Sequence, residues 1–141
     1  MEIAAVYLQA VKMDPEMPML HAPGDIHLEA DIHAARNYKH GFAENAWIPY
    51  LDITYSLRKK GSDWAAVGRF FPMIAADGPH YGDNLKLDGP GVYELTYHIA
   101  PPKSNGFLRH TDSETGTEAW WQPFDVHYSF KYIGTGKKGG Y

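Results

Sequence analysis

The stretch from Asp25 to Ala34 reads DIHLEADIHA, and apolar residues occupy each of its even-numbered positions. Such strict alternation predicts a β-strand with one buried face. The apolar residues expected in the core are Ile26, Leu28, Ala30, Ile32 and Ala34. The opposite face carries three carboxylates and two imidazoles in one line, spaced about 7 Å apart. These polar residues are Asp25, His27, Glu29, Asp31 and His33.

The chemistry of this polar face has two interpretations. Imidazole and carboxylate are the usual ligands of borderline first-row metals, so the strand suggests a metal site on a β-scaffold. Alternatively, the face is solvated, and its charges discourage pairing with another sheet edge. The strand by itself favours neither interpretation.

Length and composition limit the classes of protein to consider. A chain of 141 residues with 44% hydrophobic residues can form one domain with a real core. The net charge of −4 argues against a nucleic-acid partner. The absence of cysteine excludes thiolate zinc sites, iron–sulfur clusters and the His₂Cys blue-copper centre. It also leaves both the cytoplasm and the periplasm open as compartments. Eight histidines and five methionines point to soft or borderline metals.

From its sequence we expect neither a targeting segment nor a membrane span in residues 1–141. No apolar run reaches the roughly 20 residues that span a bilayer, so we expect a protein that is not embedded in a membrane. The first residues lead directly into strand-like sequence rather than a signal peptide. We expect residues 1–134 to form a single β-sandwich metal-binding domain and residues 135–141 to form a flexible Gly/Lys-rich tail.

The remaining sequence is also typical of β-structure, and no segment sustains a helical period. Further strands are predicted at Ile3–Val11, Leu51–Arg58, Trp64–Met73 with a break at Pro72, Tyr93–Ile99 and Phe124–Tyr132. Residues Lys59–Asp63 predict a hairpin turn. Strands of this number, separated by Gly/Pro turns, predict an all-β fold. We expect an immunoglobulin-like or cupredoxin-like antiparallel β-sandwich of about seven to nine strands.

Met73 and His80 are candidate ligands. They are seven residues apart, on either side of a Gly78-Pro79 pair where the chain is expected to leave a strand and enter a loop. Thioether favours Cu(I), and imidazole suits copper, zinc and iron, so the two side chains form a metal site if the loop folds back. Alternatively, Met73 fills a gap in the core and His80 caps a turn.

A long polar loop from Pro101 to Gly116 contains His110. With Arg109 and Asp112 nearby, His110 is either a ligand oriented by hydrogen bonds or a solvated histidine. The Trp120-Trp121 pair that follows would suit sugar stacking or a protein interface if exposed. One of the two is expected in the core, because neighbouring strand residues face opposite ways.

The other histidines are interpreted individually as solvated: His33, His40, His98 and His127. A second soft-metal site stays open in the proline-interrupted connection from Met13 to Pro23. Its candidate residues are Met13, Met17, Met19 and His21, with His33 as a further candidate.

Five stretches carry a resemblance to a known family: Ile3–Gln9, His27–His33, Trp47–Leu51, Met73–Gly82 and Arg109–Asp112. They closely resemble the periplasmic iron-transport proteins of Gram-negative pathogens, which accompany an inner-membrane iron permease. The resemblance extends from Met1 to about Ile133, nearly the whole chain.

The resemblance implies an immunoglobulin-like sandwich, a homodimer, a periplasmic location and a role in iron uptake under iron limitation. It also implies a tight copper site of three histidines, one methionine and a nearby glutamate, with binding of iron or of manganese as a surrogate. The matching residues in this sequence are His27, His80, His110, Met73 and Glu29. Precursors in the family carry a signal peptide, so this sequence would be a mature or trimmed form.

These ligand types suit two oxidation states of copper. Neutral imidazoles and a thioether add no charge, whereas Glu29 adds one negative charge; Met73 suits Cu(I) and Glu29 suits Cu(II). Our hypothesis is a non-enzymatic accessory protein that captures iron, changes its oxidation state with the help of copper, and passes it to the permease.

Three other functions are alternatives to this hypothesis. A copper chaperone or scavenger with incidental iron binding is one alternative. An interaction or carbohydrate-binding module that uses Trp120-Trp121 is another. A hydrolase is disfavoured, because neither a Ser/His/Asp arrangement nor an open zinc position with a general base is discernible.

Overall fold

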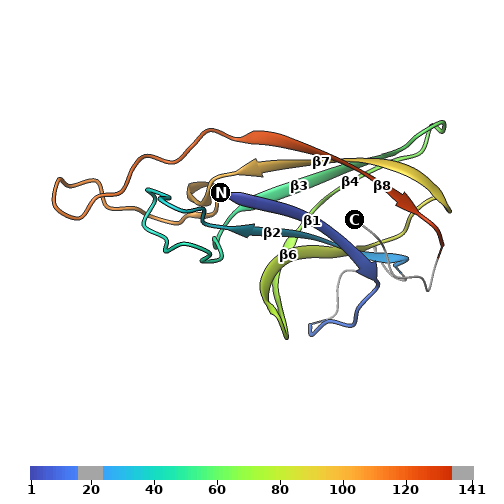
Figure 1. Cartoon of the computed structure of the whole chain (residues 1–141), viewed down its shortest axis with the longest axis horizontal. Helices are drawn as coiled ribbons and strands as arrows, with labels where there is room; N and C mark the ends of the chain where they lie inside the picture. The colour runs from blue at the N-terminus through green and yellow to red at the C-terminus, as the bar shows by residue number, and fades with distance from the viewer. Residues whose placement is uncertain (16–23, 135–141) are drawn as a thin grey trace.

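The structure, a computed structural model, describes residues 1–15 and 24–134. Eight β-strands lie within these residues and form a sandwich of two four-stranded antiparallel sheets (Figure 1). The strands are β1 (Glu2–Gln9), β2 (Ile26–His33), β3 (Asp52–Lys59), β4 (Ala65–Arg69), β5 (Phe71–Ala75), β6 (Gly78–Leu85), β7 (Gly91–Ala100) and β8 (Phe124–Tyr132). One sheet has the order β1-β2-β6-β5 and the other β4-β3-β7-β8. The predicted all-β sandwich of seven to nine strands is therefore confirmed.

Some predictions fall outside the described residues. These are the flexible tail at residues 135–141 and the candidate ligands Met17, Met19 and His21. Across the described ranges, the only helix is a short 3₁₀ turn, η2 (Pro102–Asn105), and no helix is long and apolar enough to cross a membrane.

Strand β2 has the predicted buried face. Its apolar residues from Ile26 to Ile32, and Ala34 just after its end, are each at most 2% exposed. However, β2 lies inside its sheet, between β1 and β6. The alternative that its charges protect a free edge is therefore wrong, because both edges of β2 are hydrogen-bonded to neighbouring strands.

The second sheet closes the core from the other side. Its inner strands, β3 and β7, alternate as the sequence predicted. The residues that face inward include Ile53 and Leu57 of β3 and Tyr93, Leu95, Tyr97 and Ile99 of β7. The hydroxyl of Tyr97 on β7 donates a hydrogen bond of 2.7 Å to the backbone carbonyl of Glu29 on β2. This bond joins the two sheets behind the polar face of β2.

The strand predicted from Trp64 to Met73 is interrupted at Phe70, not at Pro72 as the sequence predicted. The strand ends at Arg69, and the chain then crosses at the buried Phe70 from the second sheet into the first. The amide of Phe70 donates to the carbonyl of Ile53 at 2.9 Å. Pro72 lies within β5, which tolerates proline because β5 is the edge strand of its sheet.

The predicted loop at Gly78-Pro79 is also wrong, because these residues begin β6. Gly78 has a φ of 123°, a value that favours glycine and lets the chain reverse after β5. Strands β5 and β6 then pair so that Met73 lies directly opposite His80. Beyond Pro79, β6 also pairs with β2, from Tyr81 to Leu85. The hairpin therefore brings Met73 and His80 to the polar face of β2.

The connection between β7 and β8 projects beyond one end of the sheets (Figure 1). Trp120 and Trp121 are both half-buried there, and the sequence had predicted that one of the two would lie in the core. Trp121 packs against the core and donates a hydrogen bond of 2.9 Å to the hydroxyl of Tyr38, whereas Trp120 stacks on His40.

Candidate metal centre

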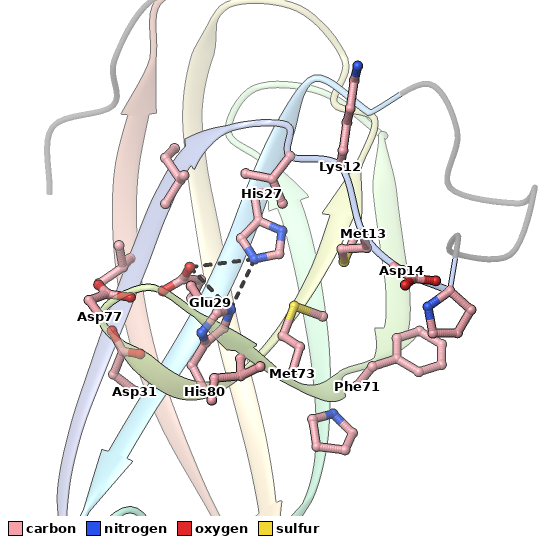
Figure 2. Close-up of a pocket in the computed structure, with 17 residues that line it drawn as sticks. Lys12, Met13, Asp14, His27, Glu29, Asp31, Phe71, Met73, Asp77 and His80 are labelled. Atoms are coloured by element: carbon pink, nitrogen blue, oxygen red, sulfur yellow. Dashed lines mark hydrogen bonds and ion pairs between the residues drawn. The ribbon is translucent and has the colours of Figure 1, made fainter.

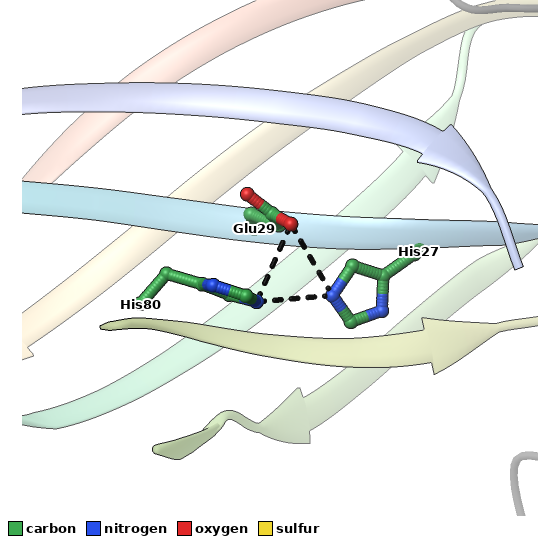
Figure 3. A group of neighbouring side chains, drawn as sticks. All are labelled: His27, Glu29 and His80. Atoms are coloured by element: carbon green, nitrogen blue, oxygen red, sulfur yellow. Dashed lines mark hydrogen bonds and ion pairs between the residues drawn. The ribbon is translucent and has the colours of Figure 1, made fainter. Parts of the chain in front are cut away.

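Three side chains from β2 and β6 converge at one point (Figure 3). The Nε2 atoms of His27 and His80 are 3.3 Å apart. The Oε1 atom of Glu29 lies 3.5 Å from the Nε2 of His27 and 3.3 Å from the Nε2 of His80. His27 and Glu29 share one face because they are two residues apart on a strand, and the β2–β6 pairing places His80 beside them.

Gly82 makes room for the His27 ring. It lies opposite Glu29 in the ladder, and a Cβ atom added there would be 2.9 Å from the Nε2 of His27. Any other residue would push the ring away from the cluster. Sequence reasoning did not single out Gly82, although a glycine inside a strand is a recognised sign of close approach by another group.

Burial controls the protonation of the cluster. His27 is 1% and His80 is 4% exposed. Burial, with a smaller effect from the neighbouring His80, lowers the pKa of His27 and favours its neutral form. Burial also raises the pKa of Glu29 to about 7, and the nearby carboxylates of Asp31 and Asp77 add to this shift. Two buried imidazoles and a carboxylate oxygen so close together form a donor set that suits a first-row metal cation.

Met73 adds a softer donor to the same pocket. It is half-buried on β5, and its sulfur points into the pocket toward the His27 and His80 rings (Figure 2). Asp31 and Asp77 line the pocket on the far side of His80, next to Glu29 (Figure 2). The pocket thus presents nitrogen, sulfur and oxygen donors within one cavity.

His110 is not part of this cluster. It is exposed on the loop between β7 and β8, where its Nδ1 lies 2.8 Å from the hydroxyl of Thr115. That loop projects from the end of the sandwich where β2 finishes, whereas His27 lies near the start of β2 (Figure 1). The expected partners of His110 also bind elsewhere: Asp112 accepts from the amide of Thr115, and Arg109 donates to the carbonyl of Thr117.

The other candidate residues are distributed around the molecule. His98 pairs with Asp125 at 2.6 Å and His127 with Thr96 at 2.9 Å, both on exposed positions of the second sheet. Met13, in contrast, lines the same pocket as Met73.

The chain is similar to a family of known proteins over nearly its whole length. A family described as Fe2+ transport protein matches residues 1–134. A UPF0423 protein of Brucella abortus is 52% identical over 145 residues, covering 100% of this chain and 80% of that protein.

Two solved relatives share the fold. FetP of uropathogenic Escherichia coli strain F11, recombinantly expressed in the periplasm of E. coli BL21(DE3), is 53% identical with a TM-score of 0.87, covering 94% of this chain and 87% of that chain. Copper-reconstituted P19 of Campylobacter jejuni is 48% identical with a TM-score of 0.89, covering 96% of this chain and 90% of that chain. A variant of FetP has also been solved with copper bound.

The raised pKa of Glu29 predicts how the stability of the metal-free protein depends on pH. Between the ordinary value of 4.5 and the folded value of about 7, the folded protein holds a proton on Glu29 that the unfolded chain has lost. The contribution of Glu29 to the free energy of unfolding therefore falls as pH rises through this interval. We expect the stability of wild type relative to Glu29→Gln to decrease from about pH 4.5 to about pH 7.5, measured by urea unfolding with a chelator present. A difference that is constant with pH would contradict this assignment.

Proposed function

Because the chain belongs to the Fe2+ transport protein family, we propose that it is a periplasmic metal-binding protein that supports high-affinity iron uptake. The observation that carries this proposal is the convergence of two buried imidazoles and the Glu29 carboxylate in a pocket that also contains Met73. The recombinant expression of the relative FetP in the periplasm supports the periplasmic location that we propose for this chain.

We assign copper to the cluster of His27, Glu29 and His80, with Met73 as the soft donor. The copper-bound structures of FetP and P19 support this assignment. Bound copper would supply a one-electron couple. The two imidazoles suit both oxidation states, whereas Glu29 offers the oxygen that Cu(II) accepts and Met73 the sulfur that Cu(I) prefers.

We assign iron, or manganese as its surrogate, to the carboxylate side of the same pocket. Such ions favour oxygen ligands more than copper does. Asp31 and Asp77 lie there next to Glu29, close enough to influence its pKa. Copper held by the neighbouring donors would pass one electron to iron here, so that Cu(I) becomes Cu(II) as Fe(III) becomes Fe(II), and iron would then leave toward an inner-membrane permease.

We further propose a homodimer in which His110 completes the copper site of the second copy. His110 and the 89% exposed Leu108 lie on a projecting loop, away from the cluster of their own chain. The resemblance of this sequence to the periplasmic iron-transport proteins includes His110 among the copper ligands. A second copy is the arrangement that reconciles this role with the exposed position of the loop.

Loss of individual donors tests the copper assignment. We expect His80→Ala to weaken both Cu(I) and Cu(II) binding by at least about tenfold, and Met73→Ala to weaken Cu(I) more than Cu(II). Competitive titration of the metal-free protein measures both affinities. The matched controls are His127→Ala and Val67→Ala, both far from the pocket on the second sheet. Full affinity in both site variants would show that the copper assignment is wrong.

Mixing two variants tests the role of His110. His110→Ala keeps the cluster, and His27→Ala keeps the loop histidine, so neither homodimer has a complete site. After dissociation and reassembly, about half of the dimers are mixed, and each of these regains one complete site, about a quarter of all sites. We expect this fraction to recover wild-type copper affinity. No recovery in dimers shown by mass spectrometry to be mixed would contradict the proposal.

A copper chaperone or scavenger is the second candidate function, favoured by the thioether of Met73. Growth of a deletion strain separates the two functions. We expect poor growth under iron limitation that added iron rescues, with unchanged tolerance of copper. Copper sensitivity with normal growth at low iron would instead favour the scavenger. Measurable Fe(II) or Mn(II) binding by the purified protein, weakened in Asp77→Asn, would independently support iron uptake.

A further inference from the structure

Asn84 contacts the cluster but is not one of its donors. It lies on β6 directly opposite His27 in the β2–β6 ladder. The Oδ1 atom of Asn84 is 2.9 Å from the Nδ1 of His27, on the side of the ring that faces away from Glu29 and His80. None of the sequence motifs pointed to this residue, because its role depends on strand pairing.

Two further bonds fix the orientation of the Asn84 amide. Its Nδ2 donates to the carbonyl of Val11 at 2.7 Å, and the amide of Val11 donates to Oδ1 at 3.3 Å. Rotating the amide by half a turn would bring Nδ2 against the Val11 amide and Oδ1 against the Val11 carbonyl. The observed orientation is therefore the one that satisfies all the groups, and Oδ1 faces His27 as an acceptor.

An acceptor at this position decides the tautomer of His27. Since Oδ1 only accepts hydrogen bonds, the Nδ1 of neutral His27 must carry the proton. The Nε2 of the same ring then has a free lone pair, directed at the point where Glu29 and His80 meet. A metal ion binds the nitrogen that has no proton, so this tautomer prepares His27 as a ligand.

The side-chain amide of Asn84 also binds the backbone of Val11, which lines the pocket. The ladder between β1 and β2 ends at the pair of Gln9 and Ile26, and Asn84 then provides the partners for the backbone of Val11. Residues 11–15, which we call the entrance strap, line the pocket beside His27 (Figure 2). One side chain thus connects the His27 ring to the entrance strap.

We propose that Asn84 is a positioning residue that keeps the proton of His27 on Nδ1 and couples metal binding at His27 to the docking of the entrance strap. The coupling rests on the proposed function, because it requires a metal at His27. The tautomer and the anchoring of Val11 are properties of the metal-free protein and do not depend on that function.

Two substitutions separate the two contacts of Asn84. Asn84→Leu removes both the acceptor for His27 and the donor for Val11. Asn84→Asp keeps an acceptor for His27 and for the amide of Val11 but loses the donor. The matched control is Asn105→Leu: Asn105 also donates its side-chain amide to a backbone carbonyl, that of Tyr50, on the exposed η2 turn.

Nitrogen NMR of the histidine rings and amide hydrogen exchange in the metal-free proteins give the first readouts. In wild type, Asn84→Asp and Asn105→Leu, we expect the proton of His27 on Nδ1. In Asn84→Leu we expect it to move partly or wholly to Nε2, with faster exchange at the Val11 amide. Retention of the wild-type tautomer and exchange rate in Asn84→Leu would overturn the proposal.

Cu(I) titration gives the second readout. We expect Asn84→Leu to bind about 10 to 100 times more weakly than wild type, and Asn84→Asp to recover most of this loss. Cu(I) should slow exchange at Val11 in wild type but not in Asn84→Leu; equal slowing in both would overturn the coupling. If wild type itself bound no copper, the proposed function would fail, while the readouts on the metal-free proteins would still decide the role of Asn84.

Discussion

The hydrogen-bonded ladder between β2 and β6 is the constraint on which both the core and the site depend. Strand β2 buries its even-numbered residues in the core and directs His27 and Glu29 to the opposite face. Strand β6 brings His80 to the same face. Because side chains alternate along a strand, a slip of one residue in this ladder would turn the ligands inward and the core residues outward. The packing of the core therefore holds the ligands in register, and Gly82 and Asn84 then set the position of the His27 ring.

The site is electrostatically unfavourable without a cation. His27 and His80 are almost fully buried, and burial opposes the charged forms of both imidazole and carboxylate. The lowered pKa of His27 and the raised pKa of Glu29 are both consequences of burial, which disfavours the charged form of each side chain. A bound cation supplies a positive charge beside the partly buried carboxylate of Glu29 and binds the free lone pairs of the rings. Metal binding should for the same reason stabilise the folded chain, since the unfolded chain does not bring these donors together.

Donors of different chemistry approach the site from different strands. The soft sulfur of Met73 comes from the edge strand β5, and the carboxylate of Glu29 from the inner strand β2. Asp31 and Asp77 extend the oxygen donors to one side of the pocket. This spatial separation of soft and hard donors is what allows one cavity to serve both copper and iron in the function that we propose. The fold alone does not imply that function, because sandwiches of this kind carry many unrelated sites.

The sequence by itself determined the class of the fold, the buried face of β2 and the strands β3, β7 and β8, because a period of two residues is a local property of a half-buried strand. It also indicated which residue types could bind metal. The tertiary structure decided that the β5–β6 hairpin brings Met73 and His80 to the polar face of β2. It also decided the crossing between sheets at Phe70 and the start of β6 at Gly78. It also separated His110 from the cluster and placed Asn84 against His27. Each of these depends on which distant segments pair, and strand pairing is set by the packing of the whole sandwich rather than by the local sequence.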